Sequence, residues 1–214
     1  MSSTDSAPLR VCNVVMCLQD TSIAAANGHL ECLKYMHENG CVWNVATSLY
    51  AAREGHLECL KYMHENGCKW HPETTFVAAA HGQLECLRYA HENGCAWDGS
   101  TTYIAASNGH LECLRYARDS SGVSCEHPTR ASCEWHPYTT YGAAMNGQLE
   151  CLKYIYERCG DIMMWENAEL EDEAGVSSED FSKEVRDYID SVREDWKCGL
   201  NKPGMRTKSA VKGY

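Results

Sequence analysis

The stretch from Ala51 to Tyr62 reads AAREGHLECLKY, and close copies of it begin at Ala24, Ala78, Ala105 and Ala143. The glycine inside it recurs at a constant interval in the first four copies and after a longer interval in the fifth. These glycines are Gly28, Gly55, Gly82, Gly109 and Gly147. Repetition at a period of about 20 to 50 residues is typical of arrays in which each unit packs on its neighbours. The sequence therefore predicts five units, with an insertion at residues 120–130.

Each unit has room for two short helices and little else. Asn44 is a good N-cap residue, and Pro72 and Pro137 fall where a helix places its first residue. A first helix that begins at these residues extends to the Ala-Ala pair. The glycine then supplies a left-handed turn, and a second helix follows, as at residues 57–66. Two helices of roughly ten residues with two turns leave no room for strands. We therefore predict an all-α fold, a right-handed α-solenoid of five short helix-turn-helix repeats with capping segments.

Cysteine, tryptophan and histidine fall at fixed positions of the unit. One cysteine position lies in the second helix, at Cys32, Cys59, Cys86, Cys113 and Cys151; another precedes a tryptophan, at Cys41, Cys68, Cys95 and Cys133. Because the repeat places them, we expect small buried apolar groups in a reducing compartment. The tryptophans are expected to cover the seams between units, and three histidines of the second helices to be core residues. These histidines are His37, His64 and His91.

The run from Gly55 to Cys68, GHLECLKYMHENGC, resembles the second half of an ankyrin repeat, and Ala51-Ala52 matches the Ala-Ala pair of that family. The resemblance covers residues 20 to 160 in five copies. It departs from the family pattern in three ways: the T-P-L-H motif is only partly present, each unit is about six residues shorter than the usual ~33, and no residues are left for the β-hairpin finger. This short form resembles the ankyrin-type repeats of giant viruses and protists. The resemblance implies noncovalent binding of a protein partner, with a host protein as partner if the chain is viral.

The sequence predicts five segments along the chain. Residues 1–19 form a degenerate half-repeat cap, 20–160 the ankyrin-like array, 161–180 an acidic connection, 181–198 a capping helix and 199–214 a basic flexible tail. Apolar residues at helical spacing from Phe181 to Trp196 support the capping helix. The alternative for this helix is a separate partner-binding segment. The insertion is either a recognition loop or a tolerated surface insertion.

Charge and hydropathy exclude some functions. The formal net charge is −11, which argues against binding of nucleic-acid phosphates. The segment from Lys197 to Tyr214 is a local exception, because it holds basic residues and no acid. No apolar run approaches a membrane span, and the amino terminus shows no signal-peptide pattern. We therefore expect a cytoplasmic or nuclear protein that is not secreted, binds neither nucleic acid nor membrane, and is monomeric.

No catalytic or metal-binding pattern stands out. The best metal-ligand spacing joins Cys125 and His127 to Cys133 and His136, but the last two repeat an ordinary Cys and His of the unit. No cysteine has the basic or helix-start setting of a nucleophile. We expect no catalysis, no cofactor and no metal. A Cys/His metal-binding enzyme and a structural subunit of a larger assembly are the alternatives to a protein-binding function.

Candidate partner-binding residues are those that differ between copies of the first helix and those of the insertion. They are Leu49, Arg53, Phe76, His81, Tyr103, Asn108, Tyr141, Ser121, His127 and Arg130. Some of these side chains must contribute to the core. Aromatic residues such as Phe76 and Tyr103 are the expected anchors.

Overall fold

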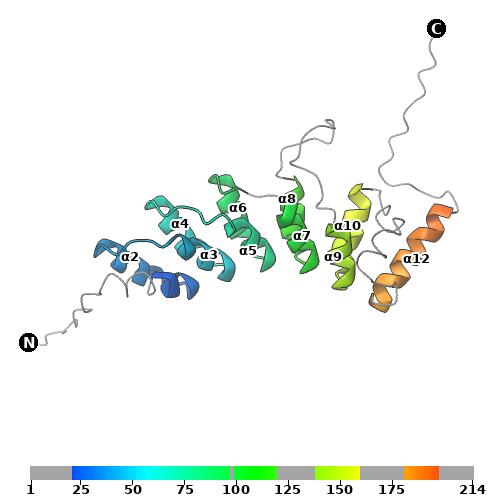
Figure 1. Cartoon of the computed structure of the whole chain (residues 1–214), viewed down its shortest axis with the longest axis horizontal. Helices are drawn as coiled ribbons and strands as arrows, with labels where there is room; N and C mark the ends of the chain where they lie inside the picture. Colours follow the sequence, from blue (N-terminus) through cyan, green and yellow to red (C-terminus); the bar gives the residue numbers. More distant parts are fainter. Residues whose placement is uncertain (1–20, 97–98, 120–137, 160–180, 198–214) are drawn as a thin grey trace, which may run out of the picture. The chain divides into compact units, whose positions relative to one another are not determined.

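The computed structural model describes residues 21–96, 99–119, 138–159 and 181–197 (Figure 1). Within these ranges every regular element is a helix and no strand occurs, as the all-α prediction requires. The chain divides into two compact units. The described part of the first comprises residues 21–78 and 85–96, and that of the second comprises 79–84 and the residues from 99 onward.

Each repeat contributes a first helix, here called the A helix, and a second, the B helix. In the first unit residues 21–26 are helical, followed by α2 (Leu30–Glu38), α3 (Val45–Glu54), α4 (Leu57–Glu65), most of α5 (Thr74–Ala80) and α6 (Leu84–Glu92). The second unit contains α7 (Gly99–Ser107), α8 (Leu111–Asp119), α9 (Thr139–Met145), α10 (Leu149–Cys159) and α12 (Lys183–Lys197). Helix α4 contacts its partner α3 and the preceding B helix α2, and α10 contacts α9 and α8 in the same way. Stacking of helix pairs therefore builds each unit.

The turn between A and B helices is left-handed, as predicted. The glycines at this turn have φ between 69° and 81°. Asn44 starts α3 by accepting a hydrogen bond from the Ala46 amide at 3.0 Å, and Nδ1 of His71 accepts one from the Glu73 amide at 3.1 Å. These contacts satisfy backbone donors that a helix start leaves open.

The B helices end in an Asn-Gly step. The side-chain amides of Asn39, Asn66 and Asn93 each donate to the carbonyl of the tyrosine four residues earlier, at 2.7–2.8 Å. The glycine that follows has φ of 84–85° in all three copies. The amide and the glycine together stop the helix and release the chain toward the next repeat.

Small and apolar side chains at repeated positions form the core. The Ala-Ala pairs are buried in every described copy, as are the cysteine and leucine of α4, α6, α8 and α10. Cys32 is an exception, because it is exposed although Leu33 beside it is buried. The burial expected for Cys32 is therefore wrong.

The connection from B helix to next A helix is held by side chains. Nε1 of Trp43 donates to the carbonyl of Asn66 at 3.1 Å, and Trp70 makes the equivalent bond to Asn93 at 2.9 Å. The hydroxyl of Thr75 donates to the Ala96 carbonyl at 2.9 Å, which ties α5 to the next connection. Trp43 and Trp70 thus cover the seams between repeats, as predicted.

All three of the repeated histidines, His37, His64 and His91, are only half-buried, contrary to the core position expected for them. The ring of His64 stacks on Trp70 with centroids 4.4 Å apart and meets Tyr89 edge-on at 6.0 Å. His37 and Trp43 repeat this arrangement at 4.7 Å. His37 and His64 pack against the outer tryptophan, because the buried volume between B helices is already filled by leucine and methionine or alanine.

Helix α12 packs beside the last described repeat. Phe181, Val185, Ile189 and Val192 are buried. The ring of Tyr188 lies 6.4 Å from that of Tyr156 in α10, edge to face. The hydroxyl of Ser182 accepts a hydrogen bond from the Val185 amide at 3.4 Å. The apolar stripe predicted here is therefore buried within the second unit, and a capping role for α12 is a proposal that this packing supports.

Candidate functional site

The exposed faces of the A helices in the first unit carry few charges. Within residues 21–26, α3 and α5, the only charged side chains are Arg53 and Glu54. Val45, Leu49 and Arg53 follow one another at a spacing of four residues and so share one side of α3. Val45 is 48% exposed, Leu49 and Arg53 are partly exposed, and Phe76 takes the place of Leu49 on α5. We call Val45, Leu49, Arg53 and Phe76 the A-helix face.

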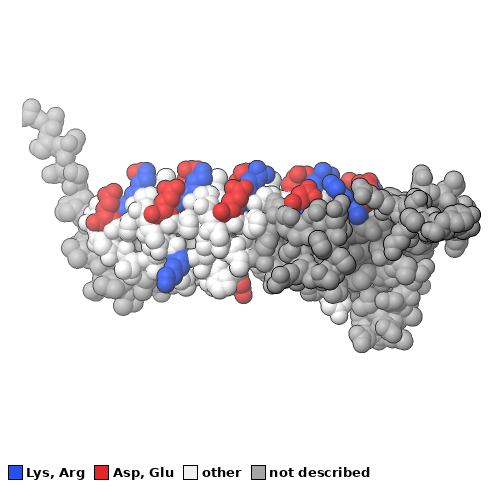
Figure 2. Space-filling view, turned by 90° about the horizontal axis from the view of Figure 1, so that it is seen from above, with Lys and Arg blue, Asp and Glu red and all other residues white. Residues whose placement is uncertain are grey.

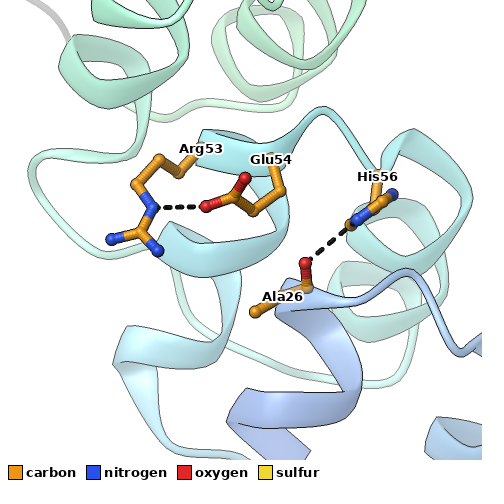
Figure 3. A network of polar contacts seen from close by, with 4 residues as sticks. All are labelled: Ala26, Arg53, Glu54 and His56. Carbon is orange, nitrogen blue, oxygen red and sulfur yellow. Dashed lines mark hydrogen bonds and ion pairs between the residues drawn. The ribbon is translucent and has the colours of Figure 1, made fainter.

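Arg53 is held in place on this face. Its Nε lies 2.7 Å from Oε1 of Glu54, and its guanidinium carbon lies 5.2 Å from the centroid of the Tyr50 ring. Figure 3 shows the ion pair between Arg53 and Glu54 together with His56, which reaches the carbonyl of Ala26. Both side chains of the ion pair are partly exposed, so the contribution of the pair to stability is small. Its effect is to orient a guanidinium group next to apolar side chains.

The candidate partner-binding residues of the second unit take part in packing more than those of the A-helix face do. An added Cβ at Gly142 would lie 2.8 Å from Cε2 of Tyr103, so the tyrosine ring of α7 rests on the backbone of α9. The side-chain amide of Asn108 donates to the Ala80 carbonyl at 2.7 Å, which joins two repeats. Tyr141 is partly exposed and His81 is exposed. Tyr103 and Asn108 therefore have structural contacts that the sequence pattern did not indicate.

Three candidates from the insertion, Ser121, His127 and Arg130, lie outside the described residues, as do the possible zinc ligands Cys125, His127, Cys133 and His136. Among the residues that are described, no group of three or more His, Cys, Asp or Glu side chains could hold a metal ion.

Sequence reasoning missed several exposed apolar residues. Ile23 is 59% exposed, Val42 55% and Tyr138 44%. Val42 stands between Cys41 and Trp43, at a position that holds lysine in the next copy and alanine in the one after. This variation between copies is the signal in the sequence, although the neighbouring Cys and Trp indicate packing.

The B helices present a different surface. Each carries a glutamate at its second position and a base three residues later, as in Lys34–Glu31 at 2.8 Å, Lys61–Glu58 at 2.9 Å and Lys153–Glu150 at 2.8 Å. Figure 2 shows the acidic and basic side chains as neighbouring red and blue groups, beside a described surface that is mainly uncharged. Pairs at this spacing support helices and keep the surface soluble, whereas the A-helix face is the apolar one.

The buried thiols are poor nucleophiles. Burial raises the pKa of Cys86 to about 12 and those of Cys68, Cys113 and Cys151 to about 11. The thiolate is the reactive form, so these groups are protonated and unreactive near neutral pH. This agrees with their expected role as packing groups.

No helix within the described ranges combines the length and the apolar character needed to cross a membrane.

Comparisons with known proteins agree with this geometry. Two sequence models of ankyrin repeats match the chain, one of three copies over residues 49–127 and one of many copies over residues 22–64. The fold is similar to the crystal structure of the human ASB11 ankyrin repeat domain, with a TM-score of 0.50 and 23% sequence identity over 64% of this chain and 67% of that one. No curated protein matches the sequence.

Proposed function

Because residues 22–127 of this chain are ankyrin repeats, we propose that the protein is a noncatalytic module that binds a protein partner through its A-helix face. The observation that carries this proposal is the contrast between the two surfaces of the first unit. The B helices pair acids with bases, whereas the A helices expose Val45, Leu49 and Phe76 around one oriented arginine.

The composition of this face suits a protein interface. Exposed apolar and aromatic side chains with a well-placed arginine are the residues that dominate binding energy in interfaces. The described repeats contain no strand that could form a finger, and Val42 and Val45 are exposed where the connection enters α3. The binding surface we propose therefore includes this connection. The proposal has three further parts that rest on the sequence. Residues 120–130 form a recognition loop, the chain comes from a giant virus or protist, and its partner is a host protein.

The test uses matched surface variants of the full chain. Leu49→Ser with Phe76→Ala removes apolar groups of the A-helix face, and Glu58→Gln with Glu85→Gln changes exposed B-helix residues only. Partners captured from cells by the native chain should be lost with the first pair and retained with the second, once circular dichroism shows that both variants fold. Capture that depends on the B-helix pair and not on the A-helix pair would refute the proposal.

Two deletions separate the remaining alternatives. If removal of residues 177–214 abolishes capture while the A-helix pair leaves it intact, the carboxyl-terminal segment is the recognition element. Loss on deletion of residues 121–130 alone would place recognition in the insertion.

A further inference from the structure

Helix α12 lies where the B helix of a further repeat would stand. Within the repeats, the residue before a B helix lies against the glycine of the preceding turn. An added Cβ at Gly28, for example, would be 2.6 Å from Nδ1 of His56, the residue before α4. At the last turn, an added Cβ at Gly147 would be 3.7 Å from the hydroxyl oxygen of Ser182, the residue before α12. Ser182 therefore takes the place that His56 has in α4.

A contact between aromatic rings gives the same alignment. His37 of α2 meets the ring of Tyr62 in the next B helix edge-on, with the centroids 6.0 Å apart. Tyr156 takes the position of His37 in α10 and meets the ring of Tyr188 in α12 edge-on at 6.4 Å. Tyr62 and Tyr188 each lie six residues after the residue that contacts the glycine. Two separate contacts thus align α12 with α4.

The buried residues of α12 follow this alignment. Val185 and Ile189 stand where α4 has Cys59 and Met63, and all four side chains are buried. Residues four positions apart share one side of a helix. One side of α12 is therefore packed in the same way as one side of a B helix in the repeats.

The neighbouring side of α12 differs from that of the repeats. Each B helix from α2 to α10 has a buried leucine directly after the cysteine, as Leu60 in α4, whereas α12 has Arg186, which is partly exposed. Four residues later, His64 of α4 contacts Tyr89 of the following repeat. Asp190 stands at this position in α12 and is exposed. The side that receives the next repeat elsewhere in the array is therefore charged in α12.

Stacking of a repeat on this side would take Arg186 and Asp190 out of water, which is unfavourable for charged groups. The first B helix has the opposite character. Cys32 is exposed and Tyr35 is 41% exposed, although the equivalent Cys59 is only 2% exposed. Two complementary ends of one chain would allow copies to join head to tail without limit. The charges on α12 remove this complementarity.

We propose that α12 closes the array at the position of a B helix, and that Arg186 and Asp190 prevent a second copy of the chain from stacking on this end. The protein then remains a monomer although its first B helix exposes residues that are buried in later repeats. The positions that hold α12 against α10 keep the character of a repeat, and the positions that would receive another repeat do not. This inference concerns the end of the array and does not depend on the A-helix face.

The first experiment tests the alignment of α12 by urea unfolding of the full chain. Gly147 has a φ of 69°, so Gly147→Ala is strained with either residue at position 182. A ring that the new methyl group would meet is present only when Ser182→His is combined with it. We expect the double variant to lower the unfolding midpoint by more than the sum of the two single variants. An additive effect would overturn the alignment.

The second experiment measures the mass of the full chain by light scattering at increasing protein concentration. The native chain should have the mass of a monomer throughout. Arg186→Leu with Asp190→His restores the residues of the repeats, and the average mass of this variant should rise with concentration. Lys183→Leu with Glu184→His makes the same change of charge at exposed positions of α12. This matched control should remain a monomer.

A further substitution identifies the surface on which the variant associates. Tyr35→Glu places a charge on the first B helix, so its addition to the Arg186 and Asp190 variant should restore the mass of a monomer. Circular dichroism checks folding, and Asp190→His alone makes the same comparison if Arg186→Leu disturbs the helix. A folded variant that stays monomeric would overturn the proposal, as would association that survives Tyr35→Glu. A native chain that associates and becomes monomeric with Tyr35→Glu would also overturn it.

Discussion

The imidazole ring of His110 lies against the backbone of Gly82, the glycine of the preceding repeat. An added Cβ at Gly82 would be 2.6 Å from Nδ1 of His110, and Nε2 of His110 donates to the Ala80 carbonyl at 3.1 Å. His56 makes the same contacts with Gly28 and Ala26. The glycine therefore has two roles. It allows the left-handed turn of its own repeat, and its lack of a side chain leaves room for the histidine ring of the next repeat.

Replacing Gly82 by alanine should destabilise the protein more than replacing Gly94. Both glycines have positive φ, 72° and 84°, so each substitution forces an alanine into the left-handed region at a cost of about 1–2 kcal/mol. Only Gly82 has a neighbour that a methyl group would meet, because nothing lies within 4 Å of the Cβ position at Gly94. The clash should add about 1–3 kcal/mol, measurable by urea unfolding. Equal losses for the two variants would show that the His110 contact is absent.

Two adjacent buried threonines should respond in opposite directions to valine. The hydroxyl of Thr75 donates to the Ala96 carbonyl, so Thr75→Val should cost about 1 kcal/mol or more. The hydroxyl of Thr74 is buried without a hydrogen-bond partner, so Thr74→Val should be neutral or stabilising by up to about 1 kcal/mol. Chemical unfolding of the two variants provides the comparison, and each serves as control for the other. A larger loss at position 74 would contradict the hydrogen bonding described here.

Among the cysteines that the structure describes, alkylation of the native protein should begin at Cys32. This thiol is exposed, whereas those of Cys86, Cys113 and Cys151 are buried with pKa values raised to about 12, 11 and 11. Iodoacetamide at pH 8 followed by peptide mass spectrometry should show labelling of Cys32 first and of the other three slowly. Guanidinium chloride should remove the difference. Rapid native labelling of Cys86 would contradict its burial.

Stability should fall in alkaline solution. Burial raises the pKa of Cys86 from 9.0 to about 12 and that of Cys113 from 9.0 to about 11, so above about pH 9 the unfolded chain loses thiol protons that the folded chain retains. The contribution of these two thiols to the free energy of unfolding should therefore be constant below pH 9 and decrease as the pH rises through 11 and 12. Urea midpoints at pH 7.5 and 10.5 test this. The variant Cys86→Ala should show a smaller decrease than the native chain, and an equal decrease would assign the effect to other groups.

Local chemistry made the helices predictable from the sequence. Gly82 could be placed at a left-handed turn because the Ala-Ala pair before it and the Leu-Glu after it are helical segments. Asn44 could be identified as a cap because its side chain suits that position. Cys59 and Leu60 could be assigned to the core because every copy repeats them.

Contacts between repeats could not be predicted in the same way. The residue after each repeat glycine is histidine in some copies and glutamine in others, and its contact with the preceding glycine depends on the distance between stacked helices. The packing of Tyr103 on Gly142 likewise requires the placement of α9 against α7.

The Asn-Gly steps of the repeats have a consequence for the chemical ageing of the protein. The sequence contains six such steps, at Asn27, Asn39, Asn66, Asn93, Asn108 and Asn146. In a flexible chain the glycine nitrogen attacks the asparagine side chain and ammonia is lost, because glycine offers no steric hindrance. At the ends of three B helices the amides of Gly40, Gly67 and Gly94 donate to the histidine carbonyls three residues earlier at 2.9–3.1 Å, and the asparagine side chains are held by tyrosine carbonyls. Deamidation there should therefore accumulate mainly in molecules whose repeats have opened, and the fraction of aspartate and isoaspartate at these positions would record how long each repeat has spent unfolded.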